Sequence, residues 1–249
     1  MFPIRDHNPS PHKPWVTWGL LISNCAIFLL TWPAFANDRE ALEFFFHWGM
    51  VPALISEGQS YGGIVTSMFL HAGWLHLLGN MLFLWIFGDN LEEEMGHLRF
   101  LLFYLACGAA AALIQYAAEP QSYSPMVGAS GAIAGVLGGY LLLYPRAQVD
   151  VFFYFLIFFR IIPVPAWIVL LIWFGMQLVG GFSMPSDQGG VAYWAHAGGY
   201  VVGLLLVVPL WLRLGGPRFW RESDGAPANP PAPPETFARS HIPVVRRRK

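Results

Sequence analysis

Residues 128–135 read GASGAIAG and place one serine, Ser130, among glycines and alanines at the start of an apolar stretch. A lone hydroxyl in such a segment has two interpretations. Small residues allow membrane helices to approach closely, so the serine can be a packing residue. A serine is also a nucleophile when a base lies beside it. The rest of the chain has to decide between packing and catalysis.

The composition is that of a membrane protein. Of the 249 residues, 55% are hydrophobic and only 12% are charged, and the mean hydropathy is +0.48. The formal net charge of −1 gives no basic field that would attract nucleic acid. The two cysteines lie in apolar runs and indicate neither a disulfide framework nor a metal site. We therefore expect the lipid bilayer as a partner, no nucleic acid and no cofactor.

The apolar runs predict an all-α membrane protein, a bundle of six transmembrane helices. A bilayer core of about 30 Å requires about 20 apolar helical residues. The six segments that qualify are residues 15–32, 64–87, 98–116, 126–144, 165–182 and 191–212. Residues 151–162 (VFFYFLIFFRII) are apolar but short, carry Arg160 and precede Pro163. We expect them to form an interfacial or re-entrant lead-in to the fifth span.

The basic residues predict the orientation of these spans. With six spans and a cytoplasmic N-terminus, thirteen of the fourteen basic residues lie inside and only Arg39 lies outside. Residues 1–14 would then be a cytoplasmic segment that leads into a retained first span, and residues 15–212 the membrane domain. Residues 213–249 would form a Pro-rich, basic and disordered cytoplasmic tail.

Polar residues recur at one depth of the predicted bundle. The second, fourth and sixth spans run from outside to inside, and each carries polar groups near its outer end. These groups are His76, Asn80, Ser130 and His196. Taken singly, a serine that packs, a hydrogen-bonded histidine or an asparagine that bonds a neighbouring helix is the simpler interpretation. Polar groups are costly in a membrane, however, and three helices presenting them together indicate a site.

Other hydrolytic chemistries fit this set less well. Aspartyl chemistry needs two carboxylates within spans, but the acids lie in loops or at span ends. A zinc motif of the HExxH type is absent, and His71 and His76 would be about 140° apart around a helix. The lysines are confined to the two ends of the chain. The remaining assignment is a dyad, with Ser130 as nucleophile and His196 as base.

Local spacing supports this dyad. His76 and Asn80 are four residues apart, share a helical face and can both donate hydrogen bonds to an oxyanion. Ser130 lies in the first turns of its helix, where backbone N–H groups are free and the helix dipole favours negative charge. Two stripes of small residues predict that the fourth and sixth helices pack backbone to backbone. The stripes are Gly131, Gly135 and Gly139, and Gly199 and Gly203.

Three motifs in order resemble those of the rhomboid intramembrane serine proteases, over essentially all six spans. GASG at residues 128–131 is similar to the family's GxSG motif, and HAGWLHLLGN at residues 71–80 to its HxxxxHxxxN motif. AHAGG at residues 195–199 is similar to AHxxG. The three together are much more specific than GxSG alone. The first residues, MFPIRD, also resemble the start of prokaryotic members.

The resemblance implies a serine endopeptidase that cleaves single-span membrane proteins near the extracytoplasmic boundary, in a prokaryotic cytoplasmic (inner) membrane. It implies Ser130 as nucleophile and His196 as general base. His76, Asn80 and the backbone N–H of Ser130 would bind the oxyanion. The residues implied to be structural near the site are His71, Gly128, Gly131 and Gly199.

Two features depart from the family pattern. Ala134 stands where some members carry an aromatic residue beneath the base, and the first outer loop lacks a Trp-Arg pair. The alternative function is a non-catalytic rhomboid-like binder of membrane proteins, or a transporter. Neither the natural substrate nor the oligomeric state can be inferred from these motifs.

Overall fold

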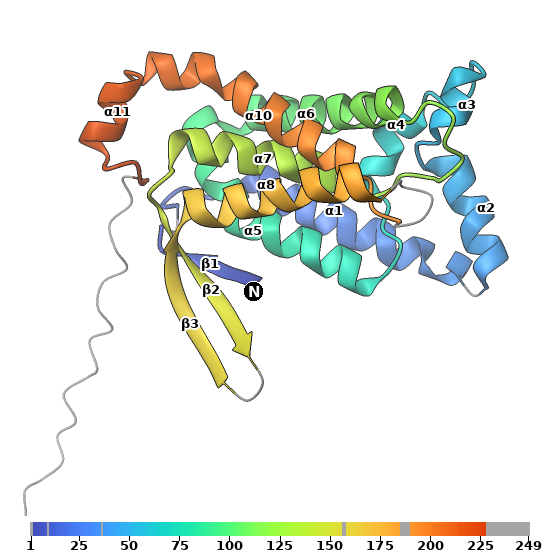
Figure 1. The fold of residues 1–249 in the computed structure, drawn as a ribbon, viewed down its shortest axis with the longest axis horizontal. Coiled ribbons are helices and arrows are strands. Elements are labelled where there is room, and N and C mark those ends of the chain that lie inside the picture. The colour runs from blue at the N-terminus through green and yellow to red at the C-terminus, as the bar shows by residue number, and fades with distance from the viewer. Residues whose placement is uncertain (1, 9, 36, 156–157, 185–189, 228–249) are drawn as a thin grey trace, which may run out of the picture.

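The body of the protein is a bundle of long helices with a small sheet at one end (Figure 1). The computed structural model describes residues 2–8, 10–35, 37–155, 158–184 and 190–227. Six helices coincide with the six predicted segments. They are α1 (Trp15–Thr31), α5 (Trp74–Met95), α6 (His97–Ala118), α7 (Ser130–Leu143), α8 (Ala166–Ser183) and α10 (Tyr193–Arg213). The prediction of a helical membrane bundle is therefore confirmed.

The number of spans stays a prediction. By length and composition, α6, α8 and α10 can each cross a membrane. A fourth span results if α5 is joined to the bent segment before it, which contains α4 (Gly63–Thr66) and η2 (Ser67–Phe69). Helices α1 and α7 are apolar but shorter, with 17 and 14 residues.

The predicted second span, which starts at Ile64, is not one straight helix. The chain bends by 89° between Gly63–Phe69 and Trp74–Met95, so that α5 begins ten residues later than expected. The short helix α4 packs instead against the chain that follows α2, because Gly63 lies directly on the backbone of Gly49 and Met50. The segment between α1 and α4 contains η1 (Trp32–Phe35), α2 (Asp38–Trp48) and α3 (Pro52–Ser56).

The expected lead-in at residues 151–162 is a β-hairpin instead. Strands β2 (Gln148–Phe155) and β3 (Phe158–Pro165) pair in antiparallel fashion, and β1 (Phe2–Asp6) adds to the free edge of β2. Aromatic and β-branched residues favour strands, and proline at positions 163 and 165 disfavours a helix. Arg5 donates to the buried carboxylate of Asp150 at 2.6 Å, which ties β1 to β2.

Within its described residues, up to 227, the tail predicted to be disordered forms the short helix α11 (Pro217–Glu222), which begins with proline at its first position. Residues 228–249, for which disorder was predicted, lie outside the described residues.

Helices α7 and α10 touch through their backbones. A Cβ added at Gly199 would collide with the carbonyl oxygen of Gly131, and one at Gly203 with that of Gly135. The two predicted stripes of small residues are therefore confirmed at these positions. On α7 the contact continues at Gly138, where an added Cβ would collide with the carbonyl oxygen of Tyr200. Gly139, which was predicted to belong to the stripe, faces side chains instead.

A buried carboxylate attaches α1 to α5. Glu92 of α5 accepts hydrogen bonds from the backbone N–H groups of Val16 and Thr17, at 2.8 and 2.7 Å, and from the Thr17 hydroxyl at 2.7 Å. The first N–H groups of a helix have no acceptor within it, and the helix dipole favours an anion there. Glu92 thus satisfies the start of α1 and fixes its position on the bundle.

We expect Gly203→Ala to destabilise the protein by about 1–3 kcal/mol, because the new methyl group must push α10 away from α7. The free energy of unfolding, measured by titrating SDS into mixed micelles, checks this. Gly175→Ala on α8 is the matched control, since a Cβ there would meet no described atom within 4 Å. Equal stability of the two variants would contradict the backbone contact.

Candidate active site

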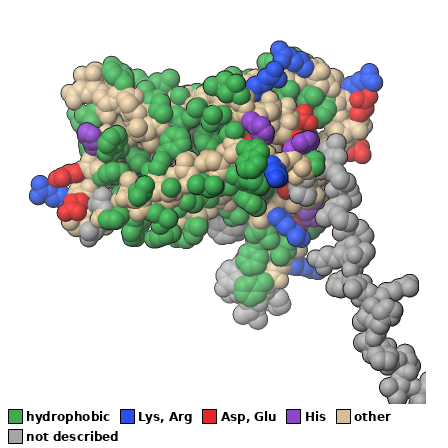
Figure 2. All heavy atoms as spheres, turned by 180° about the vertical axis from the view of Figure 1, so that it is seen from behind, with side chains coloured by type: hydrophobic (Ala, Val, Ile, Leu, Met, Phe, Trp, Pro, Cys, Tyr) green, Lys and Arg blue, Asp and Glu red, His purple; other side chains and the backbone are tan. Residues whose placement is uncertain are grey.

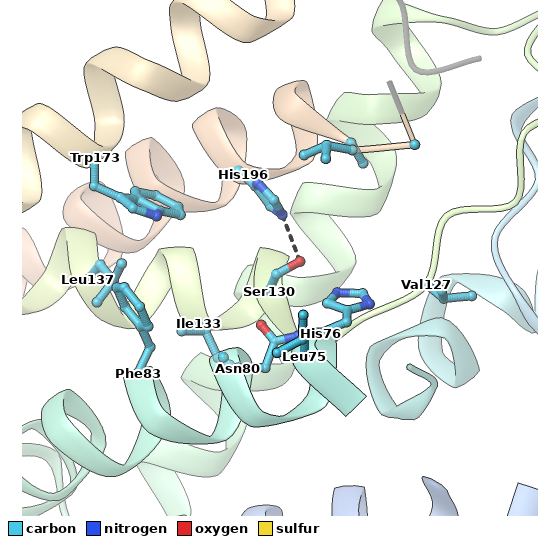
Figure 3. A pocket seen from close by; sticks show the side chains of 14 residues that line it. Leu75, His76, Asn80, Phe83, Val127, Ser130, Ile133, Leu137, Trp173 and His196 are labelled. Carbon is cyan, nitrogen blue, oxygen red and sulfur yellow. Dashed lines mark hydrogen bonds between the residues drawn. The ribbon is translucent and has the colours of Figure 1, made fainter. Parts of the chain in front are cut away.

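The contact between α7 and α10 brings Ser130 next to His196. Ser130 is the first residue of α7, and His196 lies in the first turn of α10. The hydroxyl oxygen of Ser130 is 2.7 Å from Nε2 of His196 (Figure 3). Two residues that are 66 positions apart in the sequence thus form a hydrogen-bonded pair.

A third residue, Gln177 of α8, holds the other side of the imidazole. Its amide oxygen is 2.8 Å from Nδ1 of His196. The amide nitrogen of Gln177 donates to the backbone carbonyl of Trp173 at 3.3 Å, which leaves the oxygen directed at the histidine. An amide oxygen only accepts, so Nδ1 carries the proton and Nε2 presents its lone pair to Ser130. The only trace of Gln177 in the sequence is a polar residue within an apolar run, and the sequence analysis missed it.

Trp173, one helical turn before Gln177, packs beside His196. Its ring centroid is 5.8 Å from that of His196, with an angle of 36° between the planes. Trp173 also stacks on Tyr200 of α10 at 6.2 Å. Ala134, the fourth residue after Ser130, is fully buried in α7 and has no aromatic ring. The aromatic ring that packs against His196 therefore comes from Trp173 of α8.

His76 and Asn80 of α5 lie on the other side of Ser130 from His196 (Figure 3). The backbone N–H of Ala72 donates to Nδ1 of His76 at 3.5 Å, so that Nε2 is available as a donor. The Nδ2 group of Asn80 is buried and makes no hydrogen bond within the described part of the chain. The backbone N–H of Ser130, at the start of α7, is a third donor without an acceptor in its own helix.

Gly128 makes room for this arrangement. Its φ of +128° is strained for any other residue. A Cβ at this position would also lie 2.7 Å from Nε2 of His76 and 3.4 Å from the Ser130 hydroxyl oxygen. The N–H of Gly128 donates to the carbonyl of Ser67 at 2.9 Å, which fixes the approach to α7.

His71 contacts the site through His76. Its ring is buried and packs edge to face on His76, with 5.2 Å between the centroids. Its position supports a role in holding His76. Gly131 and Gly199 lie in the contact between α7 and α10, as described above.

The polar groups face a cavity of about 490 Å³ between α5, α7, α8 and α10. The sequence grouped polar residues of the second, fourth and sixth spans into a site, and α8 contributes a wall to its cavity as well. The rest of the lining is mainly apolar and includes Leu75, Phe83, Val127, Ile133, Leu137 and Trp173. A few convergent polar groups in an apolar cavity are typical of a binding site for an apolar ligand with a small polar part.

Comparisons with known proteins agree with the motifs. The family model of the Rhomboid domain matches residues 58–213, which contain every site residue named above. RHOMBOID-like protein 11, chloroplastic, of Arabidopsis thaliana is 44% identical over 72 residues, 29% of this chain and 25% of its own. Rhomboid protein 1, mitochondrial, of Saccharomyces cerevisiae is 33% identical over 148 residues, 57% of this chain and 40% of its own.

Rhomboid protease GluP of Bacillus subtilis is 32% identical over 167 residues, 66% of this chain and 29% of its own. The matched segments thus cover less than half the length of each of these relatives. The family model, by contrast, matches more than half of this chain. The chain belongs to the rhomboid family of membrane proteins.

Proposed function

We propose that this protein is an intramembrane serine endopeptidase that cleaves transmembrane segments of other membrane proteins. The observation that carries the proposal is the 2.7 Å hydrogen bond between Ser130 and His196, at the wall of a cavity within the bundle. A protein that only binds membrane segments does not need a serine hydroxyl directed at the free nitrogen of an oriented imidazole.

The proposed reaction has two halves. The Ser130 oxygen attacks the carbonyl carbon of the substrate while Nε2 of His196 takes the hydroxyl proton. The oxyanion that forms accepts hydrogen bonds from His76, Asn80 and the backbone N–H of Ser130. His196 then gives its proton to the departing amine, which leaves an acyl-enzyme. A water molecule, deprotonated by His196, attacks this ester and restores Ser130.

The position of Ser130 suggests where the substrate is cut. Ser130 begins α7, at the end of the bundle away from the sheet, so the cleaved bond would lie near one membrane boundary. The predicted orientation makes this the extracytoplasmic boundary, with both termini in the cytoplasm. A substrate helix must unwind to reach the serine, and helix-breaking residues near the cut lower that cost. We therefore propose single-span proteins with glycine or proline near this boundary as substrates.

Removing either member of the dyad should abolish cleavage. Ser130→Ala, His196→Ala and the double variant should be equally inactive, because the two side chains act as one unit. The measurement is cleavage of a panel of single-span proteins in proteoliposomes. Ser23→Ala on α1 is a matched control, since that hydroxyl bonds only to the carbonyl of Leu20 within the described structure. Cleavage by Ser130→Ala would overturn the proposal, and capture of substrates without cleavage by the wild type would favour the binder.

Loss of one oxyanion donor should slow the reaction without stopping it. We expect Asn80→Ala to lower kcat by roughly a hundredfold to a thousandfold on a substrate limited by chemistry, because two donors remain. His76→Ala should lose more, since His76 also packs against His71. If Asn80→Ala keeps the wild-type kcat, Asn80 does not bind the oxyanion.

Gln177 is a positioning residue for the base, and its pH profile tests this. Gln177→Glu places a carboxylate beside the imidazole and favours its protonated form, which cannot act as a base. The acid limb of kcat/KM should therefore move to higher pH. Gln177→Leu should lower kcat with little change in KM, because the tautomer is no longer fixed. An acid limb that stays in place in Gln177→Glu would show that Gln177 only fills space.

A further inference from the structure

The β2–β3 hairpin extends from the bundle as an arm. Figure 1 shows it pointing across the helix axes, at the end of the bundle opposite the segment with α2 and α3. It begins after α7 ends at Leu143 and leads at Pro165 into α8. The base of the arm therefore lies level with the ends of two apolar helices, away from Ser130 at the other end of α7.

One face of this arm carries open apolar side chains. Phe152 and Ile161 are direct cross-strand partners, and Phe159, two positions before Ile161 on β3, lies on the same face. Phe159 is 66% exposed and Ile161 54% exposed, while the rings of Phe152 and Phe159 stack at 6.0 Å. Figure 2 shows hydrophobic side chains over this part of the surface. In water, such a face would be an unfavourable apolar patch.

Two exposed tryptophans lie near the point where the arm joins the bundle. Trp15 begins α1, and Trp167 is the second residue of α8, two positions after the end of β3. Both are exposed at this end of the bundle. Tryptophan is enriched where a membrane meets water, because its ring is amphipathic. The arm is thus continuous with the lipid-facing apolar surface at the interface.

The charge of the arm complements an anionic membrane surface. The residues 146–165 contain one acid, Asp150, which is buried and paired with Arg5 and His7 of the N-terminal segment. Arg146 and Arg160 are exposed. Arg160 pairs across the hairpin with Phe153 and so lies on the face opposite Phe159 and Ile161. Ile162, 38% exposed, lies on the same face as Arg160, and Arg5 lies opposite Asp150 on the face of Phe152. Both faces of the arm therefore combine apolar side chains with a basic one.

We propose that the hairpin is an interfacial membrane arm, lying along the leaflet at the end of the bundle away from Ser130. Phe152, Phe159 and Ile161 enter the boundary between acyl chains and headgroups, and Arg160 lies among anionic headgroups. The arm would resist tilting of the bundle, and so hold the cavity at a constant depth near the opposite boundary. This role concerns the lipid and does not depend on whether the protein cleaves peptides.

The test reports the surroundings of the arm in the full-length protein. Ile161→Cys is labelled with an environment-sensitive fluorophore, and the protein is reconstituted in nanodiscs containing phosphatidylglycerol. Cys25 is replaced by alanine so that it is not labelled, and Cys107 can stay because it is fully buried. Glu222→Cys, exposed on α11, is the matched control, and Phe159→Cys gives a second position on the arm. At positions 159 and 161 we expect blue-shifted emission, quenched by lipids that carry a nitroxide near the headgroup. Position 222 should respond only to a water-soluble quencher.

Two results would overturn the proposal. If positions 159 and 161 respond as position 222 does, the arm lies in water. If they are shielded from both quenchers, a protein surface such as a second copy of this chain covers them.

Discussion

The structure depends on the contact between the backbones of α7 and α10. The carbonyl oxygens of Gly131 and Gly135 occupy the space that side chains at Gly199 and Gly203 would need. In lipid, helices gain little from burying apolar surface against one another, so close packing of small residues is a main source of their association. This contact also sets the distance between Ser130 and His196, because each residue lies within a turn of a glycine in it. The same glycines therefore serve the fold and the proposed chemistry.

Each partner of the dyad is further positioned by a neighbouring helix. From α8, Gln177 hydrogen-bonds to His196 and Trp173 packs against it. Helix α5 supplies His76 and Asn80 on the opposite side of the serine. At its other end, α5 is attached to α1 through the buried carboxylate of Glu92. The proposed catalytic groups thus stand on helices with fixed packing rather than on loops, which suits a reaction that needs preorganised donors.

The site residues that could be predicted from the sequence are those that lie in recognisable motifs. Ser130, His196, His76 and Asn80 could be grouped because spans predicted to run in one direction carry them at one depth, within three specific motifs. Gln177 could not be found, because its partner lies on another helix and no spacing connects them. The hairpin at residues 148–165 was missed for a different reason: a short apolar run fits a strand as well as an interfacial helix. The start of α5 was misplaced because the bend before it depends on the tertiary contact of Gly63 with Gly49.

The most direct test of this account is the rate at which a fluorophosphonate forms an adduct in detergent, with the modified residue identified by tandem mass spectrometry. We expect an adduct on Ser130 that forms much more slowly in Gly203→Leu, because α10 then carries His196 away from the serine. Gly175→Leu, at a glycine with open space around it, should react as the wild type does. Equal rates at Ser130 in Gly203→Leu and the wild type, or an adduct on another residue, would contradict the claim that this helix contact assembles the site.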